Sequence, residues 1–452
     1  MSVFADDFIN FPSMLKLSYN FLAGRDYLKK KKFREKKKLV SVALPYSDLA
    51  FAAGAVPTFP IRMERFKIDK YLKQFNTATN LFGWKNVSNF LGFIKQFDSL
   101  NIVDNVINNV ITSINEKYNE LYDLGVAEGL PNDFCYGIKA LWGMHISKGK
   151  NVDGVLNFTI RCSAYNKYLE SLKKLVPEAK QIWIDIPPRN IGNTLEVAKK
   201  NVKEGINKLE ALTGNNVTDN SLKKQFRIGN QIKRYYKTIL FDISKSDFYP
   251  CNAASFAEIL SLLSISYQDL NSNAQRFLNN IADMVSEMKK RIKKRVGEDL
   301  TDTPRILLTP MFGGWEPKSH EFIHEFGGRV LYADWEILGY LEEIDTSGDP
   351  IEAYSQYLLN AATKGFGCDN SKTTDSYLRT AKKLDVDGVI YNQVFGCHSI
   401  SNNYYMLREK LRREGIPSTV VNFNKIGENV EQVKTRLQAF YEILESEMQH
   451  QG

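Results

Sequence analysis

The chain has 452 residues, of which 43% are hydrophobic and 25% are charged, so we expect two or three globular domains of ordinary composition. No apolar run approaches the roughly 20 residues of a membrane helix, and the N-terminus lacks the basic and apolar regions of a signal peptide. The composition therefore predicts a cytoplasmic protein without a membrane partner.

Much of the net charge of +8 lies in a run of lysines and arginines at residues 29–38. Such a run is typical of a nucleic-acid patch, of a solvated helix face, or of a surface that attracts an anionic ligand such as a nucleotide-bearing thioester. We expect the solvated face, leading into the first strand, and no nucleic-acid partner.

The first half of the chain alternates strand and helix patterns. A helix is expected to end near Ala53, several helices lie within 85–127, and another spans 166–176. Strands are expected at 39–44, 55–61, 151–160 and 181–187.

The last third repeats this scheme. Strands are expected at 304–310, 329–334, 386–394 and 416–424, with helices at 317–326, 376–384, 402–415 and 430–447. The intervening residues 194–297 have helical spacing and no strand signal.

This alternation predicts an α/β protein with two Rossmann- or flavodoxin-like, doubly wound parallel sheets related by duplication, plus a helical region. The predicted domains are residues 1–192 (N-terminal helices and the first α/β domain), 193–302 (a helical insert) and 303–452 (the second α/β domain).

The duplication is clearest where VDGVLNFTIRCS (152–163) matches VDGVIYNQVFGCHS (386–399). Each run ends in a cysteine, Cys162 or Cys397, and each has another cysteine upstream at a similar distance, Cys135 or Cys368. Ligands of open parallel sheets gather beyond the carboxyl ends of the strands. We therefore expect these thiols to face a cleft between the two domains.

Four cysteines at matched places favour a thiolate metal site over four separate buried cysteines. Soft thiolates select zinc, copper(I) or iron–sulfur clusters, and widely separated cysteines suit a cluster at a domain interface. Spacing alone leaves zinc and a cluster both open. Cys251 stands outside the duplication, and we interpret it as structural.

Five segments, in this order and spacing, resemble the iron–sulfur subunits of the 2-hydroxyacyl-CoA dehydratase and benzoyl-CoA reductase family, with a likeness to its D-component. They are LPYSDLAFAAGAVPTFPIRMER (44–65), NDFCYGIKALWG (132–143), VDGVLNFTIRCSAYNKYLESL with WIDIPPRN (152–190), VDGVIYNQVFGCHSISNNYYMLREKLRREGIP (386–417) and VKTRLQAFYEIL (433–444).

The resemblance implies that Cys135, Cys162 and Cys397 bind a [4Fe–4S] cluster and leave one iron open for another ligand. Cys368, in GFGCDN (365–370), resembles a segment of the larger benzoyl-CoA reductase-type subunits. It could be a fourth ligand, a ligand of a larger cluster or a nearby thiol, and we favour the last.

The resemblance also singles out Glu64, placed where the family often has an acidic residue close to the substrate, and its alternative is a surface carboxylate paired with Arg62 or Arg65. His398 could bond a cluster sulfide or relay a proton, or it could be structural. His320 and His324 are four residues apart, but HEFIH lacks the glutamate placement of an HExxH zinc site, so we discount them.

No GxxxxGK[ST] loop occurs, and no GxGxxG follows a strand, so any ATP must be bound elsewhere. The family uses a separate activator ATPase that carries its own iron–sulfur cluster and passes one low-potential electron. The resemblance thus implies an enzyme subunit for ketyl-radical chemistry on a CoA thioester, either 2-hydroxyacyl-CoA dehydration or aryl-CoA reduction.

Two alternatives stay open. One is a double-cubane [8Fe–9S] cluster that reduces small molecules, which would require Cys368 and Cys251 as further ligands. The other is a non-catalytic electron-transfer or scaffold subunit. In every case the partner is a second related subunit or another copy of this chain.

Overall fold

The computed structural model describes residues 7–96, 102–159, 162–187, 192–364, 370–397, 399 and 403–451. Its first sheet is fully parallel, in the order β2-β1-β3-β4. The strands are β1 (Leu39–Ser41), β2 (Val56–Thr58), β3 (Gly154–Phe158) and β4 (Lys180–Ile184). All four were predicted from the sequence.

The second sheet is also fully parallel, in the order β10-β9-β7-β8. The strands are β7 (Arg305–Thr309), β8 (Arg329–Leu331), β9 (Gly388–Val394) and β10 (Ser418–Phe423). Written from the opposite edge, the order is β8-β7-β9-β10, which matches the order β2-β1-β3-β4 of the first sheet. Strand β9 therefore takes the place of β3. The predicted two-domain α/β fold is confirmed, and the two VDGV segments occupy equivalent strands.

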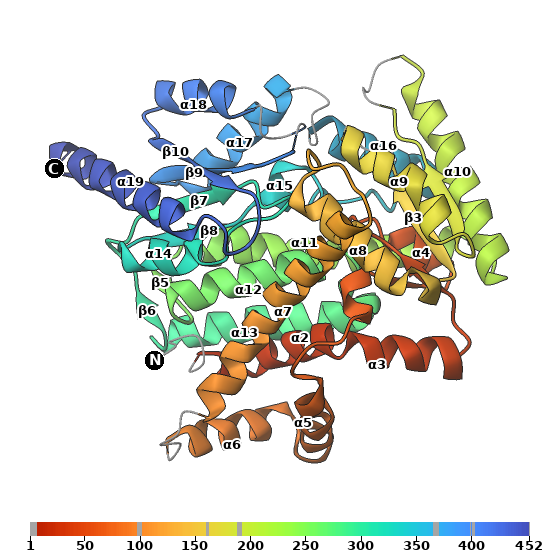
Figure 1. The fold of residues 1–452 in the computed structure, drawn as a ribbon, viewed down its shortest axis with the longest axis horizontal. Helices are drawn as coiled ribbons and strands as arrows, with labels where there is room; N and C mark the ends of the chain where they lie inside the picture. The colour runs from red at the N-terminus through yellow and green to blue at the C-terminus, as the bar shows by residue number, and fades with distance from the viewer. Residues whose placement is uncertain are drawn as a thin grey trace.

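In each sheet, the glycine of the VDGV segment has no side chain, so the helix that follows the sheet's last strand can pack closely against the strand that contains this glycine. A Cβ on Gly154 would lie 2.7 Å from Leu212, in α10 (Thr194–Thr213). A Cβ on Gly388 would lie 2.8 Å from Phe440, in α19 (Val430–Gln451). The duplication therefore extends to the covering helices, which lie at opposite sides of the molecule in Figure 1.

Helices surround both sheets. Those of the first lobe are α4 (Asp48–Ala52), α8 (Tyr136–Lys148), α9 (Ser163–Leu175) and α10. Those of the second lobe are α14 (Ser319–Glu325), α15 (Asp334–Ile337), α16 (Pro350–Lys364), α17 (Asn370–Leu384), α18 (Tyr404–Arg413) and α19. We call the two sheets with these helices the first and the second lobe.

Further helices, which we call the central helices, lie in the middle and along the lower side of the view in Figure 1. They are α2 (Pro12–Leu22), α3 (Gly24–Lys29), α11 (Asp219–Lys237), α12 (Ala253–Ser266) and α13 (Ala274–Lys293). The predicted helical region also contains β5 (Phe248–Tyr249), which pairs antiparallel with β6 (Glu298–Asp299). The sequence missed β5 because two residues carry no periodicity. The domain boundaries at 192 and 302 stay a prediction, although α10 packs on the first lobe, where Asn201 donates to the carbonyl of Asp185 (2.9 Å).

Three helices lie between β2 and α8 in the chain: α5 (Asp69–Phe82), α6 (Trp84–Gln96) and α7 (Ile102–Ala127). The pair α5 and α6 projects from the body of the molecule in Figure 1. Helix α7 holds α8 in place, because Tyr136 stacks on Tyr122 at 5.0 Å and donates to Asn119 (3.0 Å). Within the described residues, no helix is both long and apolar enough to cross a bilayer.

The basic run lies at the end of α3 and in the π-helical turn η1 (Lys30–Arg34). Lys31 pairs with Glu35 (2.6 Å), and Lys32 donates to the carbonyl of Asn151 (2.6 Å). The segment is exposed or half-buried throughout, as expected for a solvated face.

Candidate functional site

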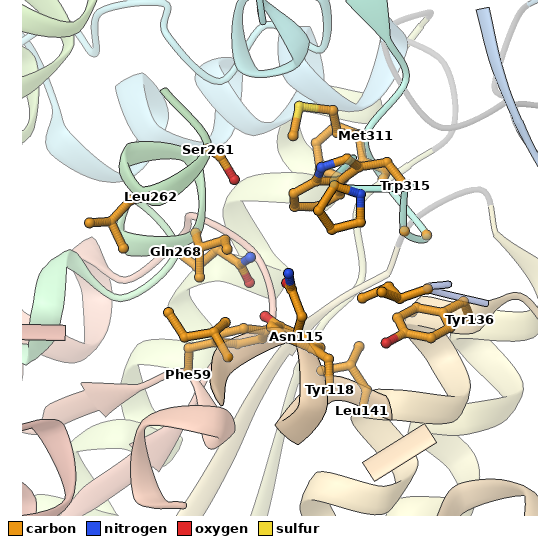
Figure 2. Close-up of a pocket in the computed structure, with 18 of the residues that line it drawn as sticks. Phe59, Asn115, Tyr118, Tyr136, Leu141, Ser261, Leu262, Gln268, Met311 and Trp315 are labelled. Atoms are coloured by element: carbon orange, nitrogen blue, oxygen red, sulfur yellow. The ribbon is translucent and has the colours of Figure 1, made fainter. Parts of the chain in front are cut away.

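A cavity of about 250 Å³, which we call the shared cavity, is lined by residues of both lobes and of the central helices. Cys135, Cys162 and Cys397 all line it. Figure 2 shows part of its wall. Three cysteines that are far apart in the sequence thus reach one space, as the repeat predicts.

Cys135 is the N-cap residue of α8 and is buried. Burial raises the pKa of the Cys135 thiol, and the nearby Cys397 and Cys162 raise this pKa further. Hydrogen bonds from the backbone of Ile138 and Gly137 act in the opposite direction. A nearby cation or metal cluster would therefore be needed to stabilise the Cys135 thiolate.

Cys162 is the N-cap residue of α9, and its sulfur accepts a hydrogen bond from the backbone of Tyr165 (3.4 Å). Two of the three thiols therefore lie at helix N-termini, where partial positive charge favours anionic sulfur.

Cys397 follows the turn at the end of β9, and this turn contacts the segment before α8. Gly396 has a φ of 72°, and a Cβ there would lie 2.4 Å from the carbonyl oxygen of Asp133 and 2.9 Å from the amide nitrogen of Cys135. The end of β7 reaches the same place, because Gly137 donates to the carbonyl of Gly313 (2.8 Å). The carboxyl ends of β7 and β9, where the strand order reverses, therefore meet the start of α8.

Among the described residues, no three or more His, Cys, Asp and Glu side chains are grouped so that they could hold one metal ion. Three thiols that line one cavity from different elements suit a group of several metal atoms, each bound by a single sulfur. The donor set present fits an iron–sulfur cluster.

The other predicted residues lie elsewhere. Cys368 and His398 fall outside the described residues. Glu64 is buried, does not line the shared cavity and pairs with Lys148 (3.4 Å), so it is not the surface carboxylate of the alternative interpretation. Its contact with a substrate stays a prediction. Cys251 is fully buried outside the cavity lining, and its structural role also stays a prediction.

Comparisons with known proteins identify the family of the chain. A family model described as 2-hydroxyglutaryl-CoA dehydratase, D-component, matches residues 48–444. The chain belongs to this family. It is also 21% identical over 291 residues to the (R)-phenyllactyl-CoA dehydratase beta subunit of Clostridium sporogenes, covering 63% of this chain and 73% of that protein. The resemblance drawn from the sequence is confirmed, and the chain is a dehydratase-type component.

Most of the cavity wall of this D-component chain has no signal in the amino-acid sequence. Figure 2 shows the side chains of Asn115, Ser261 and Gln268 pointing into one space, with Trp315 across from them. These side chains come from α7, α12 and two loops, so only the fold brings them together.

Several polar atoms of this wall lack a hydrogen bond within the described part of the chain. They are Ser18 Oγ, Gln268 Oε1, Trp315 Nε1 and His320 Nε2. Buried polar atoms are nearly always bonded, so these four are available to a bound molecule or to water. Most of the remaining wall is apolar: Leu22, Phe59, Ile114, Tyr118, Leu141, Met144, Leu262 and Ile265.

Asp334 fixes the turn between β7 and the cavity. Its carboxyl group accepts hydrogen bonds from the hydroxyl of Thr309 (2.9 Å) and the amide of Met311 (3.2 Å). Burial raises the pKa of Asp334 to about 7. Met311, which lines the cavity, is thereby held in place by a carboxyl group whose pKa lies near neutral pH.

Proposed function

We propose that the chain is the iron–sulfur subunit of an enzyme that removes water from a 2-hydroxyacyl-CoA thioester. The observation that carries the proposal is the meeting of Cys135, Cys162 and Cys397 in one mostly apolar cavity of a dehydratase-component chain. Such a cavity excludes water and so favours charge transfer to a bound substrate.

The three thiolates would hold a [4Fe–4S] cluster, with one iron left for a non-cysteine ligand. When bound, the cluster supplies one electron at low potential to the thioester carbonyl group. The chain itself orients the acyl group on the apolar wall. It offers Trp315 Nε1–H as a donor to the carbonyl oxygen and Gln268 Oε1 as an acceptor from the hydroxyl group.

The size and lining of the cavity support an apolar acyl group. A volume of about 250 Å³ accommodates an aryl or branched alkyl acyl chain, and the wall around Phe59, Tyr118 and Leu262 would bury it. The relative is named for a phenyllactyl thioester, which has such an acyl group.

ATP would be bound by a separate activator protein that carries its own cluster, because no phosphate-binding loop occurs in this sequence. The relative is named a beta subunit, which supports a second, related subunit as the other partner. We expect both partners to be cytoplasmic.

The double-cubane alternative would need Cys251 as a further ligand, and Cys251 lies outside the cavity lining. The scaffold alternative would not need a cavity of this size beside the three thiols. A reductase would share the site and would differ only in keeping the electrons in the product.

Iron analysis tests the cofactor. Anaerobically purified protein should contain about four irons per chain and absorb visible light, and Cys135→Ala, Cys162→Ala or Cys397→Ala should lose the absorbance. Cys251→Ala is the matched control and should keep it. Full iron in one of the three variants would remove that residue from the ligand set, and about eight irons per chain would favour the double-cubane cluster.

Activity tests the reaction. The chain, with a purified activator and partner subunit from the same source, is incubated with (R)-phenyllactyl-CoA and with 2-hydroxyglutaryl-CoA. We expect the unsaturated thioester to form from phenyllactyl-CoA at the higher kcat/KM. A product that has gained two electrons would instead establish the reductase, and tight cluster binding without thioester binding would establish the scaffold.

A further inference from the structure

A histidine–carboxylate pair lines the shared cavity. His320, in α14, is 2.8 Å from Glu258, in α12, measured from Nδ1 to Oε1. The His320 side chain is 1% exposed, and the Glu258 side chain is 22% exposed. Both residues line the cavity that the three cysteines reach.

The pair leaves one nitrogen of His320 ready for a ligand. The carboxylate accepts a hydrogen bond from Nδ1–H, which fixes the orientation of the ring. Nε2 is buried and has no hydrogen-bond partner within the described residues. Leaving a buried nitrogen without a hydrogen bond costs about 1–3 kcal/mol of folding free energy. Because Nε2 lies on the cavity wall, a group bound in the cavity could supply the missing hydrogen bond.

The residues around His320 do not form a two-histidine metal site with His324. His324, one turn later on α14, lies 3.4 Å from the Asn252 side chain and does not line the cavity. The two histidines therefore do not converge. Glu258 and Tyr332, whose ring lies 5.2 Å from that of His320, are the titratable side chains recorded in contact with it.

Dehydration requires a proton to move within the same cavity. The Cα–O bond breaks and hydroxide leaves, and a Cβ–H bond breaks and a proton leaves. Together they make one water molecule, so dehydration causes no net gain or loss of electrons, and the electron that a bound cluster would supply would be returned to it. A base must accept the proton from Cβ, and imidazole can take up and release a proton near neutral pH.

We propose that His320, oriented by Glu258, accepts the Cβ proton on Nε2 and passes it to the departing hydroxide. This assignment rests on the proposed dehydratase function. It makes His320 a catalytic residue and Glu258 a positioning residue, and it requires the acyl chain to lie with its β-carbon toward α14.

The first test needs no activity. The sequence contains only five histidines, so protein labelled with nitrogen-15 in histidine gives few imidazole signals, and His320→Gln assigns the one of interest. Cinnamoyl-CoA, the product expected from phenyllactyl-CoA, should shift the Nε2 signal of His320 and leave that of His324 in place. An unchanged His320 signal with saturating cinnamoyl-CoA would overturn the proposal.

The second test is kinetic and uses the complete enzyme with its activator. His320→Gln should lower kcat by about 10²- to 10⁴-fold with iron content and thioester affinity unchanged, and Glu258→Gln should lower kcat by about 10-fold or more. His324→Gln is the matched control and should retain the wild-type rate.

Deuterium at the β-carbon of phenyllactyl-CoA should slow the Glu258→Gln variant more than the wild type, because proton transfer then limits the rate. If the wild type is active and the His320→Gln variant is equally active, only the role of His320 is refuted and the proposed function stands. A wild type that binds cinnamoyl-CoA at His320 but dehydrates neither thioester refutes the proposed function instead.

Discussion

Asp153 and Asp387 make the same pair of hydrogen bonds in the two lobes. Asp153 accepts from the amide of Leu39 (2.8 Å), and Asp387 accepts from the amide of Arg305 (2.7 Å). In return, the backbone amide of each aspartate donates to the carbonyl of the same neighbour (2.8 and 2.9 Å). The aspartate of VDGV therefore closes the start of the ladder between the first and third strands of each sheet.

This equivalence predicts matched losses of stability. Asp153→Ala and Asp387→Ala should each lower the free energy of unfolding by about 1–3 kcal/mol, because a strand amide loses a charged acceptor. Urea unfolding measures the loss. Asp153→Asn and Asp387→Asn keep an acceptor oxygen and should lose less. A cost below about 0.5 kcal/mol in either lobe would show that its aspartate is dispensable.

The second prediction concerns the contact between the turn after β9 and the segment before α8. In Gly396→Ala, the new Cβ would meet backbone atoms of Asp133 and Cys135, which cannot rotate away. The left-handed φ of 72° adds strain. We expect a loss of more than about 2 kcal/mol and a lowered iron content.

Gly415→Ala is its matched control. Gly415 also has a positive φ, 69°, but a Cβ there would meet open space. It should cost about 1 kcal/mol from backbone strain alone and keep the iron. Equal effects of the two substitutions would contradict the contact between Gly396 and the Cys135 segment.

The third prediction follows from the carboxyl group of Asp334. Its pKa is raised from 3.8 to about 7 in the folded chain, so the folded state binds more protons than the unfolded state between about pH 4 and 7. The contribution of Asp334 to stability therefore falls as pH rises through this window and stays low above it. The slope for one group is at most about 1.4 kcal/mol per pH unit.

Asp334→Asn should remove this slope. Unfolding in urea at pH 5 and pH 8 should show the variant gaining stability relative to the wild type as the pH is raised. Parallel curves for the two proteins at both pH values would mean that Asp334 is ionised in the folded state at pH 5.

The sequence predicted the strands of both sheets and the meeting of Cys135, Cys162 and Cys397, because strand periodicity and a repeated motif are local signals. It did not predict the wall around Ser261 and Gln268. Helix α12 is buried on most sides, so its sequence does not mark which face borders a cavity. The sequence discounts His320 as a zinc ligand, because HEFIH lacks the glutamate placement of HExxH. Its pairing with Glu258 has no local signal, because the two residues are 62 positions apart in the chain.

The last prediction uses Ser261, whose side chain points into the shared cavity in Figure 2. Ser261→Phe would place a ring in a cavity of about 250 Å³ and should weaken cinnamoyl-CoA binding more than 10-fold, measured by calorimetry. Ser261→Ala, which leaves the space open, should bind within about threefold of the wild type. Both variants should keep their iron, because Ser261 lies on α12 whereas the three cysteines lie at the ends of other elements. Undiminished binding by Ser261→Phe would place the acyl group outside this cavity and would remove the steric basis for assigning it an apolar substrate.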